Sequence, residues 1–358
     1  MNDALSGQYD LSWLDTPCPA LDQAAAETAR QRQHQLTKPR GSLGRLEELA
    51  ILLCGMQGTA TPTPDPVYIL QVISDHGVVA EGVSVFPQEV SNQMLRNIAE
   101  GGAAVSVLAR AIDAHMEILD LGTARDPGPI PGVRTERLGP GSGNIAREPA
   151  MTEEQVARAL NIGRAAVERA VAAGARLFIG GEMGIGNTTP ATALACALLD
   201  IAPKDLVGPG TGLDAAGIDR KTRAIESALA LHRAPGRSPL ELLRRLGGFD
   251  TATLTGAYLA AAQHGLPMMI DGFIVSSAAL TAVRLQPRAR DWMLFSHTSA
   301  EPGHRRMMEA LDARPLLNLG MRLGEATAAE VTVPILRLAC ALHREMATFA
   351  EAGVSEEV

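Results

Sequence analysis

The amino-acid sequence predicts an α/β fold: a doubly wound, mostly parallel sheet flanked by helices, with a smaller helical lobe beside it. Five short apolar runs alternate with longer segments in which apolar residues recur at helical spacing. This alternation is typical of parallel sheets with crossover helices. Hydrophobic residues make up 46% of the 358 residues but aromatic residues only 3%, so small aliphatic side chains are expected to form the core.

The predicted strands are continuous apolar runs, as expected of strands that are buried on both faces of a sheet. They cover residues 67–74, 115–122, 176–182, 266–272 and 291–297. Helical patterns separate them, first from about Gln88 and then over residues 152–173, 188–200, 214–232, 251–264, 273–285 and 303–312.

The two ends of the chain contain no predicted strand. Residues 18–56 have a helical pattern around a turn at 36–44, where Ser42 is expected to cap the second helix. The chain from Met321 onward is expected to be helical, with a kink or break at Pro334. We therefore predict a Rossmann-like catalytic domain over residues 62–320 and a small helical domain made of residues 1–61 together with 321–358.

Charge and residue spacing exclude several kinds of partner. The net charge of −8 disfavours nucleic acid and anionic membranes, although a local basic pocket for one phosphate remains compatible with it. No apolar run is long enough to span a bilayer and no N-terminal secretory pattern is visible, so we expect a cytoplasmic protein. No cysteines are near neighbours and no histidine pair has the i, i+4 spacing of zinc ligands, so we expect no metal and no cofactor.

Polar and glycine-rich residues follow every predicted strand. Ligands bind at the carboxyl ends of parallel strands, so these segments together predict a site. Each of them alone also fits an ordinary turn. The segments are Asp75-His76-Gly77, Asp120 to Thr123, Gly180 to Thr189, Asp271-Gly272 and Ser296 to Glu301.

The segment Gly180 to Thr189 has the strongest features of an anion site. Its glycines allow backbone N–H groups to approach an anion, and the helix that follows adds a partial positive charge. Asn187, Thr188 and Thr189 can cap that helix and donate to phosphate oxygens. The segment 207–214 is a second glycine-rich loop before a helix, although plain turn formation also explains its glycines.

Three charged residues are candidates for binding or catalysis. Glu182, inside the first glycine-rich loop, can accept ribose hydroxyl hydrogens or act as a helix-cap partner, and Lys221 is either near the anion or on a solvated helix face. Glu325 lies between Gly324 and Ala326. In an apolar setting its pKa would rise enough for a general base near neutral pH, whereas the alternative is an exposed helical glutamate.

The order of these motifs resembles one family, the nicotinate-nucleotide:dimethylbenzimidazole phosphoribosyltransferases of cobalamin nucleotide-loop assembly. The resemblance covers about residues 38 to 330. The matching segments are KPRGSLGRLEELA (38–50), SDHGVVAEGVSVFPQEVSNQM (74–94), GSGNIAREPAMT (141–152), GEMGIGNTTPATAL (181–194), VGPGTGLD (207–214), GGFDTATLTGAYLAAAQHGLPMMIDGF (247–273), SHTSAEPGH (296–304) and MRLGEATAA (321–329).

The resemblance implies a reaction in which nicotinate mononucleotide donates 5-phosphoribose to 5,6-dimethylbenzimidazole or a related base. Nicotinate leaves, α-ribazole 5′-phosphate forms with inversion, and Glu325 acts as the general base. By the same matching, the residues that bind the nucleotide are Glu182, Gly184, Asn187, Thr188, Gly208, Gly210, Lys221 and Ser299, with Asp271 and Asp250 orienting them.

The predicted base pocket departs from some relatives, because Phe86 and Met94 are apolar where other members have small or polar residues. A flat aromatic base can stack on these side chains, although ordinary core packing also explains them. The preferred base therefore stays open. The resemblance also implies a homodimer. Two alternatives are a phosphoribosyltransferase for another heteroaromatic acceptor and a non-catalytic binder of benzimidazoles or nucleotides.

Overall fold

The computed structural model describes residues 10–210, 212–232 and 237–355, and within them it has a six-stranded sheet in which every pairing is parallel. The strands are β1 (Val67–Ser74), β2 (His115–Gly122), β3 (Val133–Thr135), β4 (Leu177–Met183), β5 (Met268–Ile270) and β6 (Met293–Phe295). Their spatial order is β3-β2-β1-β4-β5-β6. The chain fills one side of the sheet and then the other, so the order reverses between β1 and β4, the place where Rossmann folds bind ligands.

The helices alternate with the strands as the sequence predicts. They are α1 (Gln23–Gln35), α2 (Arg45–Gln57), α3 (Glu89–Ala99), α4 (Ala104–Ala111), α5 (Glu153–Ala172), α6 (Thr188–Leu199), α7 (Ala215–His232), α8 (Pro239–Leu246), α9 (Phe249–Gln263), α10 (Phe273–Leu285), α11 (His304–Ala310), α12 (Thr327–Glu345) and α13 (Phe349–Ala352). Short 3-10 turns are η1 (Ser12–Asp15), η2 (Gly77–Glu81), η3 (Pro203–Asp205) and η4 (Pro287–Trp292). No helix within the described residues is long and apolar enough to cross a membrane.

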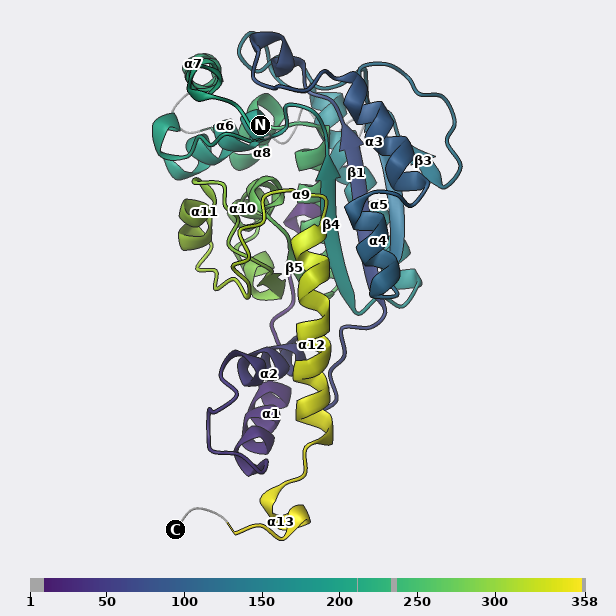
Figure 1. Ribbon diagram of the computed structural model, residues 1–358, viewed down its shortest axis with the longest axis vertical. Coiled ribbons are helices and arrows are strands. Elements are labelled where there is room, and N and C mark those ends of the chain that lie inside the picture. The colour runs from purple at the N-terminus through teal and green to yellow at the C-terminus, as the bar shows by residue number, and fades with distance from the viewer. Residues whose placement is uncertain (1–9, 211, 233–236, 356–358) are drawn as a thin grey trace.

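Helices cover both faces of the sheet (Figure 1). Two adjacent glycines in β4 allow this close packing. A Cβ on Gly180 would lie 2.6 Å from the Tyr258 hydroxyl of α9, and a Cβ on Gly181 would lie 2.8 Å from Ala326 Cβ just before α12. The two faces of β4 therefore contact two different helical segments without room for a side chain.

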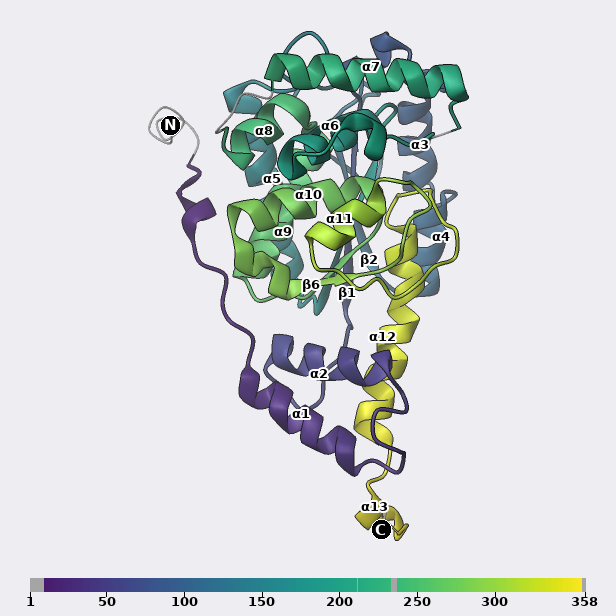
Figure 2. The same ribbon diagram turned by 90° about the vertical axis from the view of Figure 1, so that its left-hand side faces the viewer.

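The N-terminal helices α1 and α2 pack beside the half of α12 that extends beyond the sheet (Figures 1 and 2). Arg32 donates from Nε to the His343 carbonyl over 2.7 Å, and Gln33 Nε2 lies 2.9 Å from His343 Nδ1. The two ends of the chain are thus held together, whereas the predicted division into domains 62–320 and 1–61 with 321–358 stays a prediction.

Several local predictions were wrong. Strand β3 and helix α8 were missed, since an edge strand of three residues and a helix of eight are too short to give a clear periodic pattern. Gly44, not Ser42, is the residue that precedes α2, because Ser42 lies within the turn and its N–H donates to the Pro39 carbonyl. Pro334 lies inside a continuous α12, where it removes one backbone donor without ending the helix.

Candidate active site

A pocket of about 680 Å³ lies at the carboxyl end of the sheet, on the β4-β5-β6 side of the point where the strand order reverses. Loops after β4, β5 and β6 line it together with the segment before α12 and residues from the start of α3. Most of the predicted site residues line this one pocket, namely Phe86, Met94, Glu182, Gly184, Asn187, Thr188, Gly210, Asp271, Ser299 and Glu325. Segments that are far apart in the sequence therefore meet where the strand-end pattern predicted a site.

The first glycine-rich loop passes close to the end of β1. A Cβ on Gly184 would lie 1.9 Å from the Ser74 carbonyl oxygen, so only glycine fits there. Asn187 occupies the N-cap position of α6 but makes no side-chain cap, which corrects the predicted capping role. Its amide donates to the Glu182 carboxylate instead. The backbone N–H groups of Asn187 and Thr189 donate to the Gly184 and Gly186 carbonyls, and Pro190 has no N–H, so the first turn of α6 offers an anion few free backbone donors beside its partial positive charge.

Lys221 and Gly208 lie behind the pocket wall. Lys221 is fully buried, and its Nζ donates to Thr188 Oγ1 over 2.9 Å and to the Gly208 carbonyl over 3.2 Å. Burial lowers the pKa of Lys221 to about 8. Of the two alternatives from the sequence, the solvated helix face is excluded, and the ammonium group joins both glycine-rich loops at one point.

Three carboxyl groups line the pocket together, and one of them, Glu182, belongs to the first glycine-rich loop itself. Burial raises the pKa of Glu325 to about 7, and burial also raises the pKa of Asp271 to about 7, although the backbone N–H groups of α12 act against the shift. The pKa of Glu182 is raised well above its ordinary value by burial and then by the neighbouring carboxylates of Asp250 and Asp271. Near neutral pH, Asp271 and Glu325 can therefore exchange protons with a ligand.

Glu325 is held by an unusual backbone. Gly324, Glu325 and Ala326 have φ values of +84°, +57° and +62°, a left-handed run that non-glycine residues rarely adopt. Such strain of about 1–3 kcal/mol per residue is concentrated at functional sites. Here it turns Glu325 toward the pocket directly before α12 begins, and Glu325 is 6% exposed, which excludes the alternative of an exposed helical glutamate.

Asp250 does not line the pocket. It is fully buried and forms an ion pair with His76, with Oδ2 3.2 Å from Nε2. Charge and hydrogen bonding from Asp250 raise the pKa of His76 against the opposing effect of burial. A Cβ on Gly184 would lie 3.4 Å from His76 Nε2. The His76–Asp250 pair therefore packs directly against the first glycine-rich loop.

The sequence did not single out three polar residues of the pocket: His297, Glu301 and Arg322. Burial lowers the pKa of His297 to about 4, so its ring is neutral near pH 7. Arg322 donates to the Gly210 carbonyl over 2.9 Å and adds a positive charge near the second glycine-rich loop. All three lie inside segments that the sequence already marked, but their types alone gave no reason to select them.

One end of the pocket is apolar. Phe86, Val90 and Met94 come from α3 and the turn before it, and Met183 and Ile185 come from the glycine-rich loop. Phe86 is 47% exposed, so it is not an ordinary core side chain. A flat apolar ring fits this end, next to the carboxyl cluster.

The fold and the pocket together define a protein of the α/β class with a polar pocket beside the point where the strand order of its sheet reverses. A family model described as phosphoribosyltransferase matches residues 18–354, and the chain therefore belongs to this family. Nicotinate-nucleotide--dimethylbenzimidazole phosphoribosyltransferases from Ectopseudomonas mendocina and Azotobacter vinelandii are 58% and 59% identical to it. These alignments cover 97% and 96% of this chain and 99% and 98% of the relatives.

Two solved structures from Thermus thermophilus are also similar to this chain. A crystal structure of the enzyme with the same name is 44% identical with a TM-score of 0.89, over 94% of this chain and all of its own. A second is 45% identical with a TM-score of 0.90, over 93% of this chain and all of its own. Among the described residues, no three His, Cys, Asp or Glu side chains are arranged to hold a metal ion.

Proposed function

We propose that this protein transfers 5-phosphoribose from nicotinate mononucleotide to 5,6-dimethylbenzimidazole or a related base. The products are α-ribazole 5′-phosphate and nicotinate, as in cobalamin nucleotide-loop assembly. The observation that carries the proposal is the presence of Glu325 in one pocket with residues of both glycine-rich loops. The names of the relatives support the same pair of substrates.

The proposed chemistry needs a base but no acid. One benzimidazole nitrogen attacks the anomeric carbon, and the bond from that carbon to the pyridine nitrogen breaks. The electron pair of the broken bond neutralises the cationic pyridine ring, so nicotinate leaves unprotonated. Glu325 takes the proton from the other benzimidazole nitrogen, a role that suits a carboxyl group whose pKa is raised to about 7.

The predicted substrate-binding residues divide between the two halves of the reaction. The phosphate is proposed to lie at the N-terminus of α6, near Thr188 and Lys221. Glu182 and Asp271 are proposed to face the ribose, where their oxygen atoms can accept hydrogen bonds from its hydroxyl groups. Phe86 and Met94 are proposed to hold the base at the apolar end of the pocket.

The test is incubation of the protein with nicotinate mononucleotide and 5,6-dimethylbenzimidazole, without added metal, followed by chromatography for α-ribazole 5′-phosphate. Formation of that product supports the proposal. Nicotinate release only with another heteroaromatic base would favour the alternative acceptor. Binding of both compounds without turnover would favour a non-catalytic binder.

Four further properties are part of the proposal. The protein is proposed to act in the cytoplasm and as a homodimer, and to need no cofactor. Residues 62–320 are proposed to form the catalytic domain, with residues 1–61 and 321–358 forming the helical one. Size-exclusion chromatography with light scattering measures the oligomeric state directly, and a monomer at micromolar concentration would contradict the dimer.

A further inference from the structure

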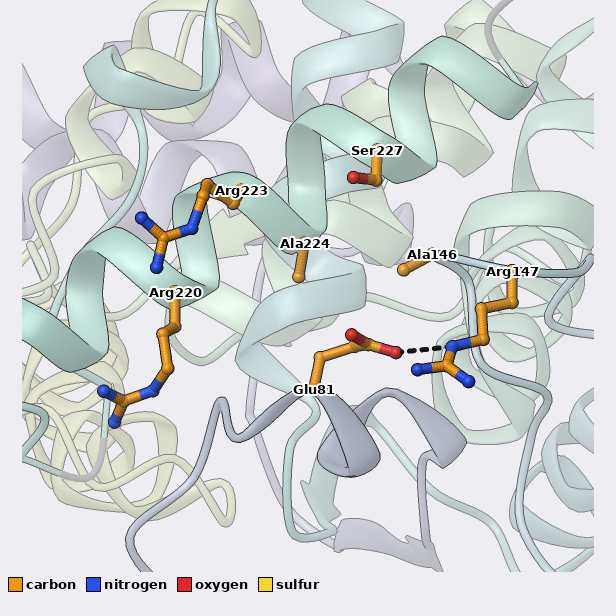
Figure 3. Close-up of a pocket in the computed structure, with 7 residues that line it drawn as sticks. All are labelled: Glu81, Ala146, Arg147, Arg220, Arg223, Ala224 and Ser227. Atoms are coloured by element: carbon orange, nitrogen blue, oxygen red, sulfur yellow. Dashed lines mark hydrogen bonds and ion pairs between the residues drawn. The ribbon is translucent and has the colours of Figure 1, made fainter.

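A second, smaller hollow of about 200 Å³ lies outside the active site, between η2, the segment at Arg147 and helix α7. Figure 3 shows Arg220, Arg223 and Ser227 on α7, across from Glu81 and Arg147. The α7 residues are spaced three and four apart, so they share one face of the helix. Three arginines and one glutamate line this hollow, in a protein whose net charge is −8.

The charge of the one acid in the hollow is already matched. Glu81 Oε1 accepts from Arg147 Nε over 2.8 Å and from Asn144 Nδ2 over 2.7 Å. The Asn144 hydrogen bond, followed by Arg147, lowers the pKa of Glu81, so this carboxylate stays ionised. Glu81 therefore neutralises Arg147 and forms no ion pair with Arg220 or Arg223, the other two arginines of the hollow.

The charges of Arg220 and Arg223 are not compensated within the part of the chain that the structure describes. There, Arg220 Nε donates only to the Gly82 carbonyl, over 3.3 Å, and Arg223 has no hydrogen bond or ion pair with any described residue. Asp219 and Glu226 are close to them along α7, yet neither forms an ion pair with these arginines among the same residues. Arg220 and Arg223 are thus exposed arginines with free donors on one side of the hollow. Figure 3 shows their guanidinium groups extending away from Glu81, so both side chains would turn inward to share one anion.

We propose that this hollow binds a phosphate group through Arg220 and Arg223. A guanidinium group presents a planar set of donors that matches phosphate oxygens, and its hydrogen bonds to an ionised oxygen are stronger than neutral ones. The Ser227 hydroxyl is a further donor on the same face. The volume suits one small anion, either inorganic phosphate or the phosphate of a nucleoside monophosphate.

An anion in this hollow would bridge two elements that support the active site. Arg220 adjoins Lys221, which contacts Thr188 from the other side of α7. On η2, Val79 packs against the glycine-rich loop, since a Cβ on Gly186 would lie 2.6 Å from Val79 Cγ2. A bound phosphate would therefore hold α7 against η2 and stabilise the folded protein through its binding free energy.

The test is equilibrium dialysis of the full-length protein against radiolabelled inorganic phosphate, which counts bound phosphate per chain. The Arg220→Ala/Arg223→Ala variant is expected to bind one phosphate fewer per chain, or to bind that phosphate with a Kd raised about tenfold or more. The matched control is Arg305→Ala/Arg306→Ala on α11, whose guanidinium groups pair with Glu309 and which is expected to bind as the wild type does.

Two results would overturn the proposal: equal phosphate binding by all three proteins, or a loss of phosphate together with an equal loss of nicotinate mononucleotide binding. The second result would place the lost phosphate in the main pocket. Adenosine 5′-monophosphate as a competitor then distinguishes the sources. The wild type and the control are expected to bind one phosphate that the double variant does not bind. If adenosine 5′-monophosphate displaces that phosphate, the natural ligand is a nucleotide phosphate. If it does not, the natural ligand is free phosphate.

Discussion

Lys221 Nζ donates to Thr188 Oγ1 over 2.9 Å, so a fully buried ammonium group lies behind the first turn of α6. The same nitrogen donates to the Gly208 carbonyl over 3.2 Å. One positive charge thus orders both glycine-rich loops and adds to the partial positive charge of the helix N-terminus. A phosphate bound there would depend on whether Lys221 is protonated.

The first prediction concerns the pH dependence of nucleotide binding. Burial lowers the pKa of Lys221 to about 8, so its charge is present below that pH and is lost above it. The KM for nicotinate mononucleotide should therefore rise as pH increases through about 8. Lys221→Met should raise the KM about tenfold or more at pH 7 and remove that rise. Lys204→Met, at an exposed lysine, should behave as the wild type, and a pH-dependent KM that persists in Lys221→Met would assign the effect to another group.

The second prediction concerns Glu325. Glu325→Gln should lower kcat by about a hundredfold to ten-thousandfold, the usual contribution of a general base, while nicotinate mononucleotide binds as before. In the wild type, kcat/KM should fall as pH decreases below about 7, because the protonated carboxyl group cannot accept a proton. Glu345→Gln, on an exposed residue at the far end of α12, controls for removal of a charge. Near-wild-type turnover in Glu325→Gln would exclude it as the essential base.

The sequence predicted the strands of the sheet better than it predicted the contacts between distant residues around the pocket. Strands β1 and β2 begin and end at the predicted residues because each is a continuous, largely buried apolar run. Strand β4 is shifted by one residue from the predicted run 176–182, whereas β5 and β6 are shorter than their predicted runs and β3 is too short to form a pattern. The glycine-rich loops and the strand-end acids stood out by their residue types at those positions, whereas the role of Glu325 as the base was implied by the resemblance to the family.

Contacts between residues that are far apart in the sequence could not be predicted from local residue patterns. Nothing along the chain indicates that Asp250 pairs with His76, since the two lie on different elements and meet only in the folded sheet. The left-handed φ of Glu325 and Ala326 was also hidden, because neither residue type favours that conformation. Both features follow from tertiary packing, which a single sequence does not encode locally.

The third prediction concerns the apolar end of the pocket. Met94→Gln places an amide where a flat base is proposed to pack, so the KM for 5,6-dimethylbenzimidazole should rise about fivefold or more. The KM for nicotinate mononucleotide should not change. Met116→Gln, half-buried at the opposite end of the sheet, is the matched control. If Met94 were only a core residue, the variant would unfold at a lower temperature and keep its KM for the base.

The fourth prediction concerns stability and Glu330, which is fully buried with neither carboxyl oxygen hydrogen-bonded to a described residue. Burial, followed by the charges of Asp271 and Glu325, raises its pKa to about 9. The unfolded chain releases the proton near the ordinary value of 4.5, so the folded state binds more protons between these two pH values. The contribution of Glu330 to the free energy of unfolding is therefore fully present below about pH 4.5. It decreases as the pH rises toward 9, by up to about 1.4 kcal/mol per pH unit.

Glu330→Gln should remove this part of the pH dependence, because the amide stays neutral throughout. Urea unfolding at pH 5, 7 and 8.5 measures it, as the difference between the variant and the wild type. That difference reports Glu330 together with its charge coupling to Asp271 and Glu325, while the raised pKa of Glu182 adds to the slope in both proteins. The variant should gain stability relative to the wild type as pH increases, while Glu345→Gln should not. Parallel curves for Glu330→Gln and the wild type would mean that Glu330 is already ionised in the folded protein.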